Sequence, residues 1–523
     1  MRFPSRRLRK EIAAVIAACA ILAACAREPR RPNILLVSID TLRADHLGAY
    51  GYERNTSPAI DALAREGTVF ENAWSTTSWT LPAHVSLMTG LPVSAHAQCD
   101  FDLQATEAVA THLPRGRFIA EDLAGASYDT AGFYSCVYLE PKFGFGAGFA
   151  TWERAYHSFQ SEPGVAERWK AARQANDVEA MKRIHAENPA LFDSEARTAP
   201  VAVDSALDWL EKRGDDRDPF FLFVHVYDVH TGYTPPAPYD TLFDPDYHGT
   251  LDGRRLTDPE SLFQKGMDPR ELAHVIALYD GEIAGVDREL ARLFQALERS
   301  GVAKDTLVIV TADHGEEFFE HGGKLHGSTL YREALHVPLI VKWPGHVPAG
   351  ARRTEPVSLI DVAPTLRAAA VVESDVRLPG FDLLQPSFAP RELIGQVVMR
   401  RGIAEPFWLA SLIDEREQII VRHPGREDWS AERFDLTRDP REQEAPEHID
   451  ASSPDAAALL ERLAAARAIL RRLRDEAPVR ARTEGKIEDA ERMHLEALGY
   501  GGGATGESSH ESGLCFDGCI WRP

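Results

Sequence analysis

Positively charged residues are outnumbered in this chain. Its 523 residues include 58 lysines and arginines against 80 aspartates and glutamates, which gives a formal net charge of −22. No basic block occurs after the first ten residues, so the folded part is not expected to bind nucleic acid. Apolar residues make up 44% and charged residues 26% of the chain, which are globular values that exclude wholesale disorder. The length allows one large domain with a smaller appendage.

Cysteine is also scarce, with six residues in the chain. Four of them follow the N-terminal segment, namely Cys99, Cys136, Cys515 and Cys519. The last two flank a short Phe-Asp-Gly turn, and an oxidising compartment would permit a local disulfide between them. Two sulfurs alone make a poor zinc site, so this pair predicts no structural zinc.

The N-terminus has the form of an export signal. Basic residues within 1–10 precede an apolar run, Ile12 to Ala24, that is too short to serve as a membrane-spanning anchor. The run ends Leu-Ala-Ala-Cys25, which resembles a bacterial lipobox, whose cysteine carries lipid after cleavage. We therefore expect a bacterial lipoprotein, periplasmic or at the cell surface, held to the membrane by lipid on Cys25. The alternative is an ordinary signal peptide cut nearby.

Two apolar segments far apart in the chain each end in an acidic residue. Residues 33–39 read as a buried strand that is followed by Asp40, and residues 307–310 read as a second strand, followed by Asp313 and His314. Ligands of open α/β sheets lie at the carboxyl ends of the strands. Two carboxylates and an imidazole gathered there predict a site for one divalent metal ion.

Strand and helix patterns alternate from Asn33 to about residue 350, which predicts an α/β fold with a mainly parallel sheet. Residues 220–226 read as another buried strand, and 155–205 read as a polar, mostly helical insertion or lid. The expected organisation is a signal peptide (1–24), a tether (25–32), a catalytic domain (33–350), a smaller C-terminal α+β subdomain (351–450), a helical segment (451–500) and a Gly/Ser/Cys tail (501–523).

The segment 80–90, Thr-Leu-Pro-Ala-His-Val-Ser-Leu-Met-Thr-Gly, resembles the nucleophile signature of the sulfatase family. Thr80 stands in the nucleophile slot and His84 in the slot of an arginine. Other segments resemble further blocks of the family in the same order, among them 38–52, 227–236, 278–287, 330–345, 359–366 and 434–442. The resemblance implies a fold of the alkaline phosphatase superfamily, in which a mainly parallel sheet is sandwiched by helices and followed by a small C-terminal subdomain.

The same resemblance implies that Thr80 joins Asp40, Asp313 and His314 around the metal. Many sulfatases carry a second aspartate directly after the first, where this chain has Thr41, and often an asparagine where it has His314. Both changes favour zinc or manganese over calcium as the ion.

Histidines supply the other candidate catalytic groups. The resemblance makes His230 a candidate acid for the leaving group and His326 a candidate ligand of substrate oxygen. For His84 and His321 the sequence leaves two roles open, namely binding anionic oxygen and bracing a loop. His225 and His336 lie in apolar strand-like runs and are expected to be structural. Glu316 and Glu317 are expected to stabilise a helix N-terminus.

Two departures from the family pattern bear on the reaction. Formylglycine arises by oxidation of the CH2 group of cysteine or serine, and the methyl group of Thr80 prevents that product. Residues 127–136 also lack the lysine and histidine that relatives often carry there. We therefore expect an ester hydrolase that cleaves phosphate or sulfate esters, with phosphate favoured. The alternatives are a phosphoryl-group transferase of the same superfamily and a lipoprotein that binds anionic glycans without turning them over.

Overall fold

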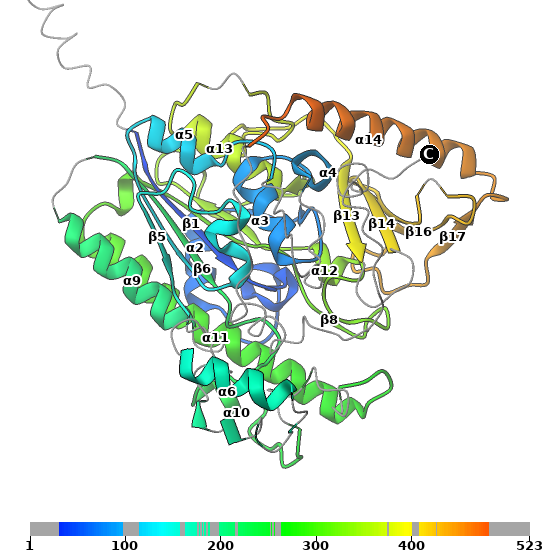
Figure 1. Ribbon diagram of the computed structural model, residues 1–523. Helices are drawn as coiled ribbons and strands as arrows, with labels where there is room; N and C mark the ends of the chain where they lie inside the picture. The colour runs from blue at the N-terminus through cyan, green and yellow to red at the C-terminus, as the bar shows by residue number, and fades with distance from the viewer. Residues whose placement is uncertain are drawn as a thin grey trace, which may run out of the picture.

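The computed structural model describes residues 31–97, 114–156, 163–174, 198–214, 218–251, 263–373, 376–399, 407–424 and 426–480, with a few single residues between these ranges. The expected signal peptide, Cys25, Cys99, Cys515 and Cys519 lie outside them. The largest sheet among these residues has eight strands (Figure 1). Their order is β11 (Ala351–Arg353), β2 (Thr68–Phe70), β10 (Leu339–Lys342), β7 (Thr306–Ala312), β1 (Asn33–Ile39), β6 (Phe220–Val226), β4 (Asp129–Tyr134) and β5 (Thr151–Arg154).

The sheet is mainly parallel, as the sequence predicts. β10 runs antiparallel to β2 and β7, and the other neighbouring strands pair in parallel. β1 lies at the centre, between β6 and β7, and its residues from Ile34 to Ile39 are buried. A strand covered on both faces is apolar along its whole length, which is why 33–39, 220–226 and 307–310 read as continuous apolar runs.

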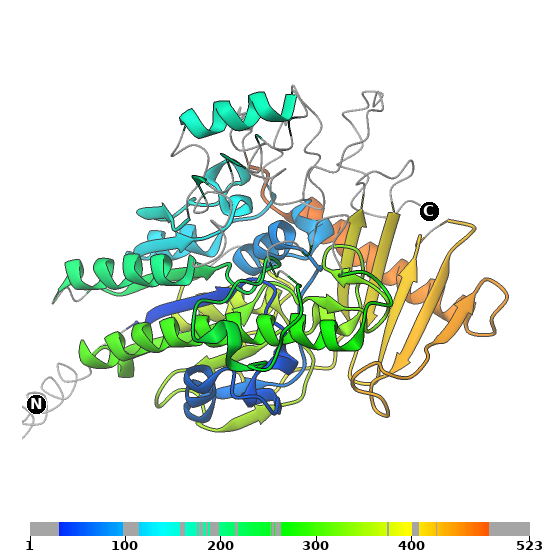
Figure 2. The ribbon, with the colours of Figure 1, turned by 90° about the horizontal axis from the view of Figure 1, so that it is seen from below.

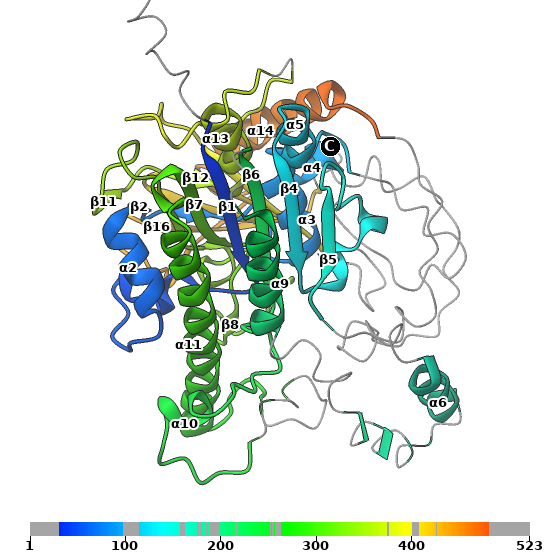
Figure 3. The ribbon, with the colours of Figure 1, turned by 90° about the vertical axis from the view of Figure 1, so that its left-hand side faces the viewer.

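Helices cover both faces of this sheet. On one face lie α2 (Pro58–Glu66), α9 (Thr198–Arg213) and α11 (Pro269–Arg299), with α9 and α11 side by side (Figure 3). On the other face α3 (Thr80–Thr89), α5 (Ile119–Gly125) and α13 (Val362–Ala369) pack together (Figure 1). α11 begins where the Asp268 side chain accepts a hydrogen bond from the Arg270 N–H, with Pro269 as the first helical residue. The predicted sandwich of sheet and helices is confirmed.

The second unit begins later than residue 351. β11 pairs with β2 in the large sheet, β12 (Val357–Ser358) pairs with β3 (Ala73–Trp74), and α13 packs on α3. The expected boundary at 351 is therefore wrong for these segments, because backbone pairing at a sheet edge does not require apolar side chains. The C-terminal sheet is antiparallel and contains β13 (Leu393–Met399), β14 (Phe407–Ile413), β15 (Glu417–Arg422), β16 (Ser430–Asp435) and β17 (Glu447–Asp450).

This smaller sheet stands beside the large one and is covered by α14 (Ala456–Glu476), as Figures 1 and 2 show. Leu459, Leu463 and Leu470 of α14 pack against Leu412 and Val421 of the sheet, so this part of the helical segment expected at 451–500 is an amphipathic helix. α14 also contacts α4 (Val93–His96) of the main unit. Beyond residue 480 the helical segment and the tail lie outside the described residues.

Shorter elements complete the description. They are α6 (Pro163–Gln174), α10 (Tyr239–Leu242), α12 (Arg332–Leu335), β8 (Glu317–Phe318) and β9 (Lys324–Leu325). The insertion expected at 155–205 is seen only as α6, the start of α9 and scattered residues, so its suggested role as a lid stays a prediction. Across the described part of the chain, no helix combines the length and the apolar character needed to span a membrane.

Candidate metal and nucleophile site

The ends of β1 and β7 bring the predicted metal ligands together. Ile39 pairs with Ala312 in adjacent strands, so Asp40 and Asp313 leave the sheet side by side. The backbone N–H of Thr41 donates to Oδ1 of Asp313 at 3.2 Å and thereby ties the two strand ends to each other. One ligand atom each from Asp40, Asp313 and His314 lies within 4.8 Å of the others, and all three residues are fully buried.

The carboxylate oxygens in this cluster fit a cation. Oδ1 of Asp40 and Oδ2 of Asp313 are buried, and neither has a hydrogen-bond partner among the described residues. A buried carboxylate oxygen without a partner is costly unless a cation or donor meets it. Nδ1 of His314 lies 2.9 Å from the carbonyl oxygen of Gly315 and donates to it, which leaves the lone pair of Nε2 facing the carboxylates. Nε2 lies 3.3 Å from Oδ2 of Asp313.

Burial and neighbouring charges shift the pKa values of Asp40, Asp313 and His314 in different directions. Burial, reinforced by the charge of Asp313, raises the pKa of Asp40 well above its usual value. Burial alone would also raise the pKa of Asp313, but the neighbouring imidazoles of His314, His84 and His225 lower it below its usual value. Burial opposes a charge on His314, and the two carboxylates outweigh it and raise the pKa of that imidazole. The cluster thus has the electrostatics of a cation site.

Thr80 is the first residue of α3 and presents its hydroxyl to the cluster. Its Oγ1 lies 3.4 Å from Oδ2 of Asp40 and 3.3 Å from Nε2 of His314. α3 ends at Gly90, which adopts the left-handed conformation with φ 71° that glycine accepts at a helix C-terminus. The structure therefore places the predicted nucleophile against the predicted metal ligands.

His84 lies one turn after Thr80, and both of its ring nitrogens contact protein groups. Nδ1 is 2.9 Å from the backbone oxygen of Thr80 and Nε2 is 3.0 Å from Oγ of Ser38. The residue is fully buried, and burial lowers its pKa to about 3. Of the two roles left open by the sequence, this geometry fits bracing α3 against β1, because neither nitrogen is left for a substrate oxygen.

His225, which is expected to be structural, faces the candidate metal ligands from β6. Its Nε2 lies 3.4 Å from Oδ2 of Asp40 and forms no hydrogen bond with the described residues. Its Nδ1 accepts a hydrogen bond from the backbone N–H of Ser135 at 3.3 Å, so Nε2 carries the proton of the neutral ring. In the register of β1 and β6, His225 pairs with Ser38, two residues before Asp40. Sequence reasoning would have needed this register to place His225 beside Asp40.

Three imidazoles gather next to this site. The ring of His326 lies 4.7 Å from the ring of His230 and 4.6 Å from the ring of His314. Nδ1 of His326 donates to Oε1 of Glu316 at 2.9 Å. Burial and the neighbouring His326 lower the pKa of His230 to about 3, so its imidazole is neutral at neutral pH. The two predicted substrate-facing histidines are therefore brought together beside the metal cluster.

Glu316 and Glu317 do not begin a helix, because β8 starts at Glu317. Glu316 is fully buried and its Oε2 accepts hydrogen bonds from the hydroxyls of Thr231 and Tyr233, each at 2.8 Å. It therefore orients the segments that carry His230 and His326. The prediction of a helix N-terminus was wrong because the glycines of 322–323 turn the chain back into the short β8–β9 hairpin.

His321 and His336 lie away from the metal cluster. Nδ1 of His321 is 2.8 Å from Oε1 of Glu333, and Nε2 is 2.8 Å from the backbone oxygen of Glu442. His321 thus braces the junction with the C-terminal subdomain, which is one of the two roles expected for it. His336 donates from Nε2 to the backbone oxygen of Glu71 at 2.7 Å, as a structural histidine would.

Comparisons with known proteins place the chain in a family. Residues 32–372 match the family model described as Sulfatase. The chain belongs to the sulfatase family. An arylsulfatase of Clostridium perfringens (strain 13 / Type A) is 23% identical over 448 residues, which cover 79% of this chain and 89% of that protein. The multifunctional alkaline phosphatase superfamily protein PehA of Trinickia caryophylli is 27% identical over 391 residues, covering 64% and 73% of the two chains.

Solved structures show the same fold. The phosphonate monoester hydrolase of Agrobacterium radiobacter superimposes with a TM-score of 0.62 at 22% sequence identity, over 85% of this chain and 96% of that one. Membership of the sulfatase family makes the protein a sulfuric or phosphoric ester hydrolase. Within that family, the site combines Thr80 in the nucleophile slot with Thr41 directly after Asp40 and with His314 among the candidate metal ligands.

Proposed function

We propose that this sulfatase-family protein is a metal-dependent hydrolase of phosphate esters, with sulfate esters as the second substrate class, and that Thr80 is its nucleophile. The observation that carries the proposal is the position of the Thr80 hydroxyl, between Oδ2 of Asp40 and Nε2 of His314. A hydroxyl is a weak nucleophile unless a base or a cation activates it, and this one has candidates for both.

Asp40, Asp313 and His314 would hold one divalent ion, zinc or manganese in preference to calcium. When bound, such an ion supplies charge to neutralise the ester oxygens and lowers the pKa of a hydroxyl that it contacts. Nε2 of His225, 3.4 Å from Oδ2 of Asp40, would limit the orientations open to that carboxylate.

The chain's own groups account for the first half-reaction. Oδ2 of Asp40 receives the proton of Thr80 while Oγ1 attacks phosphorus, so an O–P bond to Thr80 forms and the bond from phosphorus to the leaving oxygen breaks. A water molecule then attacks the phosphothreonine in line and gives a proton to His230. The O–P bond to Thr80 breaks, Asp40 returns its proton to Oγ1, and the acid product is released.

His230 is the proposed acid for the leaving oxygen. Burial keeps its imidazole neutral in the free site, and an anionic ester placed against it would favour the protonated form. His326, whose Nδ1–H is held by Glu316, would donate a hydrogen bond from Nε2 to an ester oxygen when its ring is doubly protonated. Both roles use residues that the structure brings within one cluster of imidazoles.

Phosphate is favoured over sulfate on chemical grounds. The methyl group of Thr80 prevents formylglycine, the aldehyde through which ordinary sulfatases release sulfate, whereas a phosphothreonine can be hydrolysed by water. Residues 127–136 also contain no lysine or histidine that could bind an anionic ester. Among the relatives, the Clostridium protein bears the name arylsulfatase and the Agrobacterium protein phosphonate monoester hydrolase, so both ester classes are represented around this chain.

We further propose that the protein is exported and held at a membrane surface through lipid on Cys25, in the periplasm or at the cell surface. The support is the Leu-Ala-Ala-Cys sequence after an apolar run. Two or three acyl chains suffice for stable anchoring where one would not.

A substrate screen tests the proposed activity. Metal-loaded protein is assayed with an aryl phosphate, an aryl phosphodiester and an aryl sulfate, beside the Asp313→Ala variant. We expect the phosphate substrates to be turned over faster than the sulfate and the variant to be inactive. Turnover only when an alcohol acceptor is added would identify a transferase. Absence of turnover of every ester by the metal-loaded wild type would contradict the proposal and favour a glycan-binding lipoprotein.

A further inference from the structure

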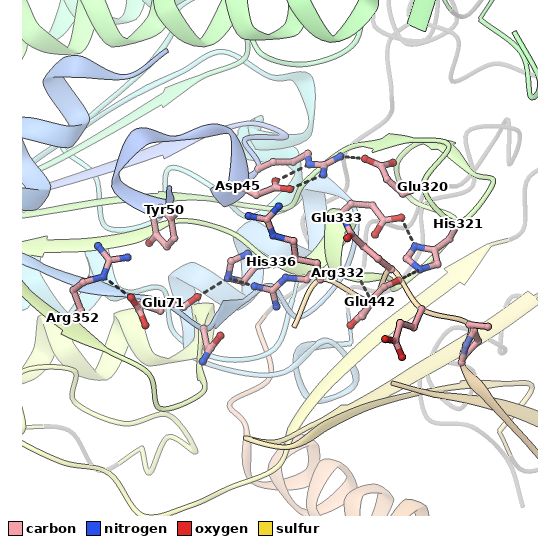
Figure 4. Close-up of a pocket in the computed structure, with 17 residues that line it drawn as sticks. Asp45, Tyr50, Glu71, Glu320, His321, Arg332, Glu333, His336, Arg352 and Glu442 are labelled. Atoms are coloured by element: carbon pink, nitrogen blue, oxygen red, sulfur yellow. Dashed lines mark hydrogen bonds and ion pairs between the residues drawn. The ribbon is translucent and has the colours of Figure 1, made fainter. Parts of the chain in front are cut away.

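A cavity of about 760 Å³ lies where the main unit meets the C-terminal subdomain (Figure 4). One wall comes from the main unit and includes Arg43, Glu333 and His336, and the opposite wall is the segment 441–446 between β16 and β17. None of Thr80, Asp40, Asp313, His314, His230 and His326 lines it. The cavity is therefore separate from the candidate active site.

Most charged groups around this cavity are already paired. Arg43 binds Asp45 and Glu320, Arg352 binds Glu71, His321 binds Glu333, and Glu444 binds Arg438 outside the cavity. Each of these acids therefore has its charge compensated by the protein. A cation would find no unpaired carboxylate among them.

Arg332 differs from the other arginines of the cavity. Its guanidinium lies 5.1 Å above the ring of Trp74 and forms no ion pair with the described residues, and its Nη2 lies 3.2 Å from Nε2 of His336. That imidazole nitrogen lies only 2.7 Å from the backbone oxygen of Glu71, to which it must donate its proton. Nε2 of His336 therefore has no lone pair to offer, and the contact drawn between Arg332 and His336 in Figure 4 does not give the guanidinium an acceptor.

A second unpaired guanidinium faces the same space. Arg441 is exposed and forms no ion pair within the described part of the chain. Burial lowers the pKa of Arg332, the charges of Glu442 and Asp45 raise it, and the charge of Arg441 lowers it further. The carboxyl of Glu442 compensates for the two guanidinium groups only in part. Its Oε2 accepts the backbone N–H of Arg332 at 2.9 Å, its Oε1 is buried without a partner, and burial raises its pKa to about 7.

We propose that this cavity is a second anion site, in which Arg332 and Arg441 bind one tetrahedral oxoanion, as a free phosphate or sulfate ion or as the ester group of a sugar. Two like-charged groups whose charges are only partly compensated repel each other, and an anion between them removes that repulsion. Each guanidinium offers a fork of two N–H groups, and a tetrahedral oxoanion has enough oxygens to accept from both forks.

The site is connected to the catalytic segment through the backbone. The N–H groups of Gly315 and Glu316 donate to the carbonyl oxygens of Ala334 and Glu333 at 2.8 and 3.0 Å. Arg332 begins the short helix α12 that carries these two carbonyl groups. An anion bound by Arg332 would therefore contact a helix whose backbone is hydrogen-bonded to the two residues that follow Asp313 and His314.

The proposal is tested by calorimetric titration of inorganic phosphate and sulfate into the full-length Asp313→Ala protein, in which the catalytic anion site is disabled. We expect one anion to bind. Arg332→Gln and Arg441→Gln added to this background should each weaken binding roughly tenfold or more, the loss typical of a charge-assisted hydrogen bond. Arg352→Gln is the matched control, because Arg352 lines the same cavity but is paired with Glu71, and it should leave the affinity unchanged.

No phosphate or sulfate binding to Asp313→Ala would overturn the proposal, as would binding that both glutamine variants leave unchanged or that Arg352→Gln weakens equally. If circular dichroism shows that Arg332→Gln fails to fold, the exposed Arg441 decides the question. Glucose 6-phosphate provides the second arm. Tighter binding of this sugar ester than of inorganic phosphate identifies an ester as the occupant, and weaker binding identifies the free ion.

Discussion

The hydroxyl oxygen of Thr80 lies 3.3 Å from Nε2 of His314, although 234 residues separate them in the chain. This contact joins the start of a helix on one face of the sheet to the end of β7 at its centre. It brings the only candidate nucleophile of the family signature against the imidazole of the metal cluster.

One divalent metal ion should bind at Asp40, Asp313 and His314. Purified protein should contain about one equivalent of zinc or manganese, and Asp313→Ala should lose it, because that substitution removes one of three ligands. Elemental analysis of both proteins provides the measurement. Asp228→Asn is the control, since Asp228 is also buried but accepts its hydrogen bonds from Thr198 and Ala199. Metal-free wild type together with unaltered behaviour of Asp313→Ala would disprove the site.

Residue 80 should remain an unmodified threonine. Oxidation to an aldehyde requires a CH2 group next to the heteroatom, and Thr80 carries a methyl group there. Mass spectrometry of the peptide that spans residue 80 should give the mass that the gene encodes. A peptide lighter by two hydrogens would contradict this prediction and would point to a ketone at that position.

The charge of His321 should make stability depend on pH. Burial alone would lower its pKa, but the hydrogen bond and charge of Glu333 raise it from 6.5 to about 9. Because the folded-state pKa is the higher one, the stabilisation is complete below pH 6.5 and is lost as the pH rises through 9. His321→Gln should therefore cost roughly 2 kcal/mol below pH 6.5 and progressively less towards higher pH.

Urea denaturation of both proteins across this pH range measures the difference. The exposed His248 provides the control, since His248→Gln should leave the pH profile unchanged. A difference between wild type and His321→Gln that is the same at low and high pH would show that His321 contributes only by packing.

Lipid on Cys25 should hold the protein in the membrane fraction. Cys25→Ser removes the thiol that the lipobox presents, and no acyl anchor can then form at that position. The variant should move to the soluble fraction on cell fractionation. If it remains with membranes to the same extent as wild type, the lipoprotein interpretation fails and an ordinary export signal becomes the better account.

The part of the site that could be predicted from the sequence consists of residues at strand ends. Asp40, Asp313 and His314 each follow an apolar run, and central parallel strands produce such runs because both their faces are covered. The family resemblance then gave Thr80, His230 and His326. These residues could be identified from the local apolar pattern and the order of the motifs alone, and the structure brings them together.

The residues that were missed depend on pairing between strands. His225 sits inside β6, and only the register that sets it opposite Ser38 shows that it faces Asp40. Likewise, Arg352 pairs with Val69 at the edge of the large sheet. Backbone hydrogen bonds hold this polar strand, and the sequence has no apolar pattern there that would predict it. The cavity beside Arg332 and His336 exists only once the C-terminal subdomain has docked, because residues 441–446 form one of its walls.

The central claim is that the Thr80 hydroxyl forms the bond to the transferred group. The most direct test is the activity of metal-loaded Thr80→Ala and Thr80→Ser on the best ester of the screen, with metal content measured in each. Serine keeps the oxygen and loses only the methyl group that restricts its rotamer, so we expect partial activity.

Alanine keeps Asp40, Asp313 and His314 but removes the covalent route, so a fall of several orders of magnitude in kcat is the predicted result. Thr80→Ala protein that binds its metal and retains more than about a tenth of wild-type activity would contradict the account, because water would then be attacking the ester directly.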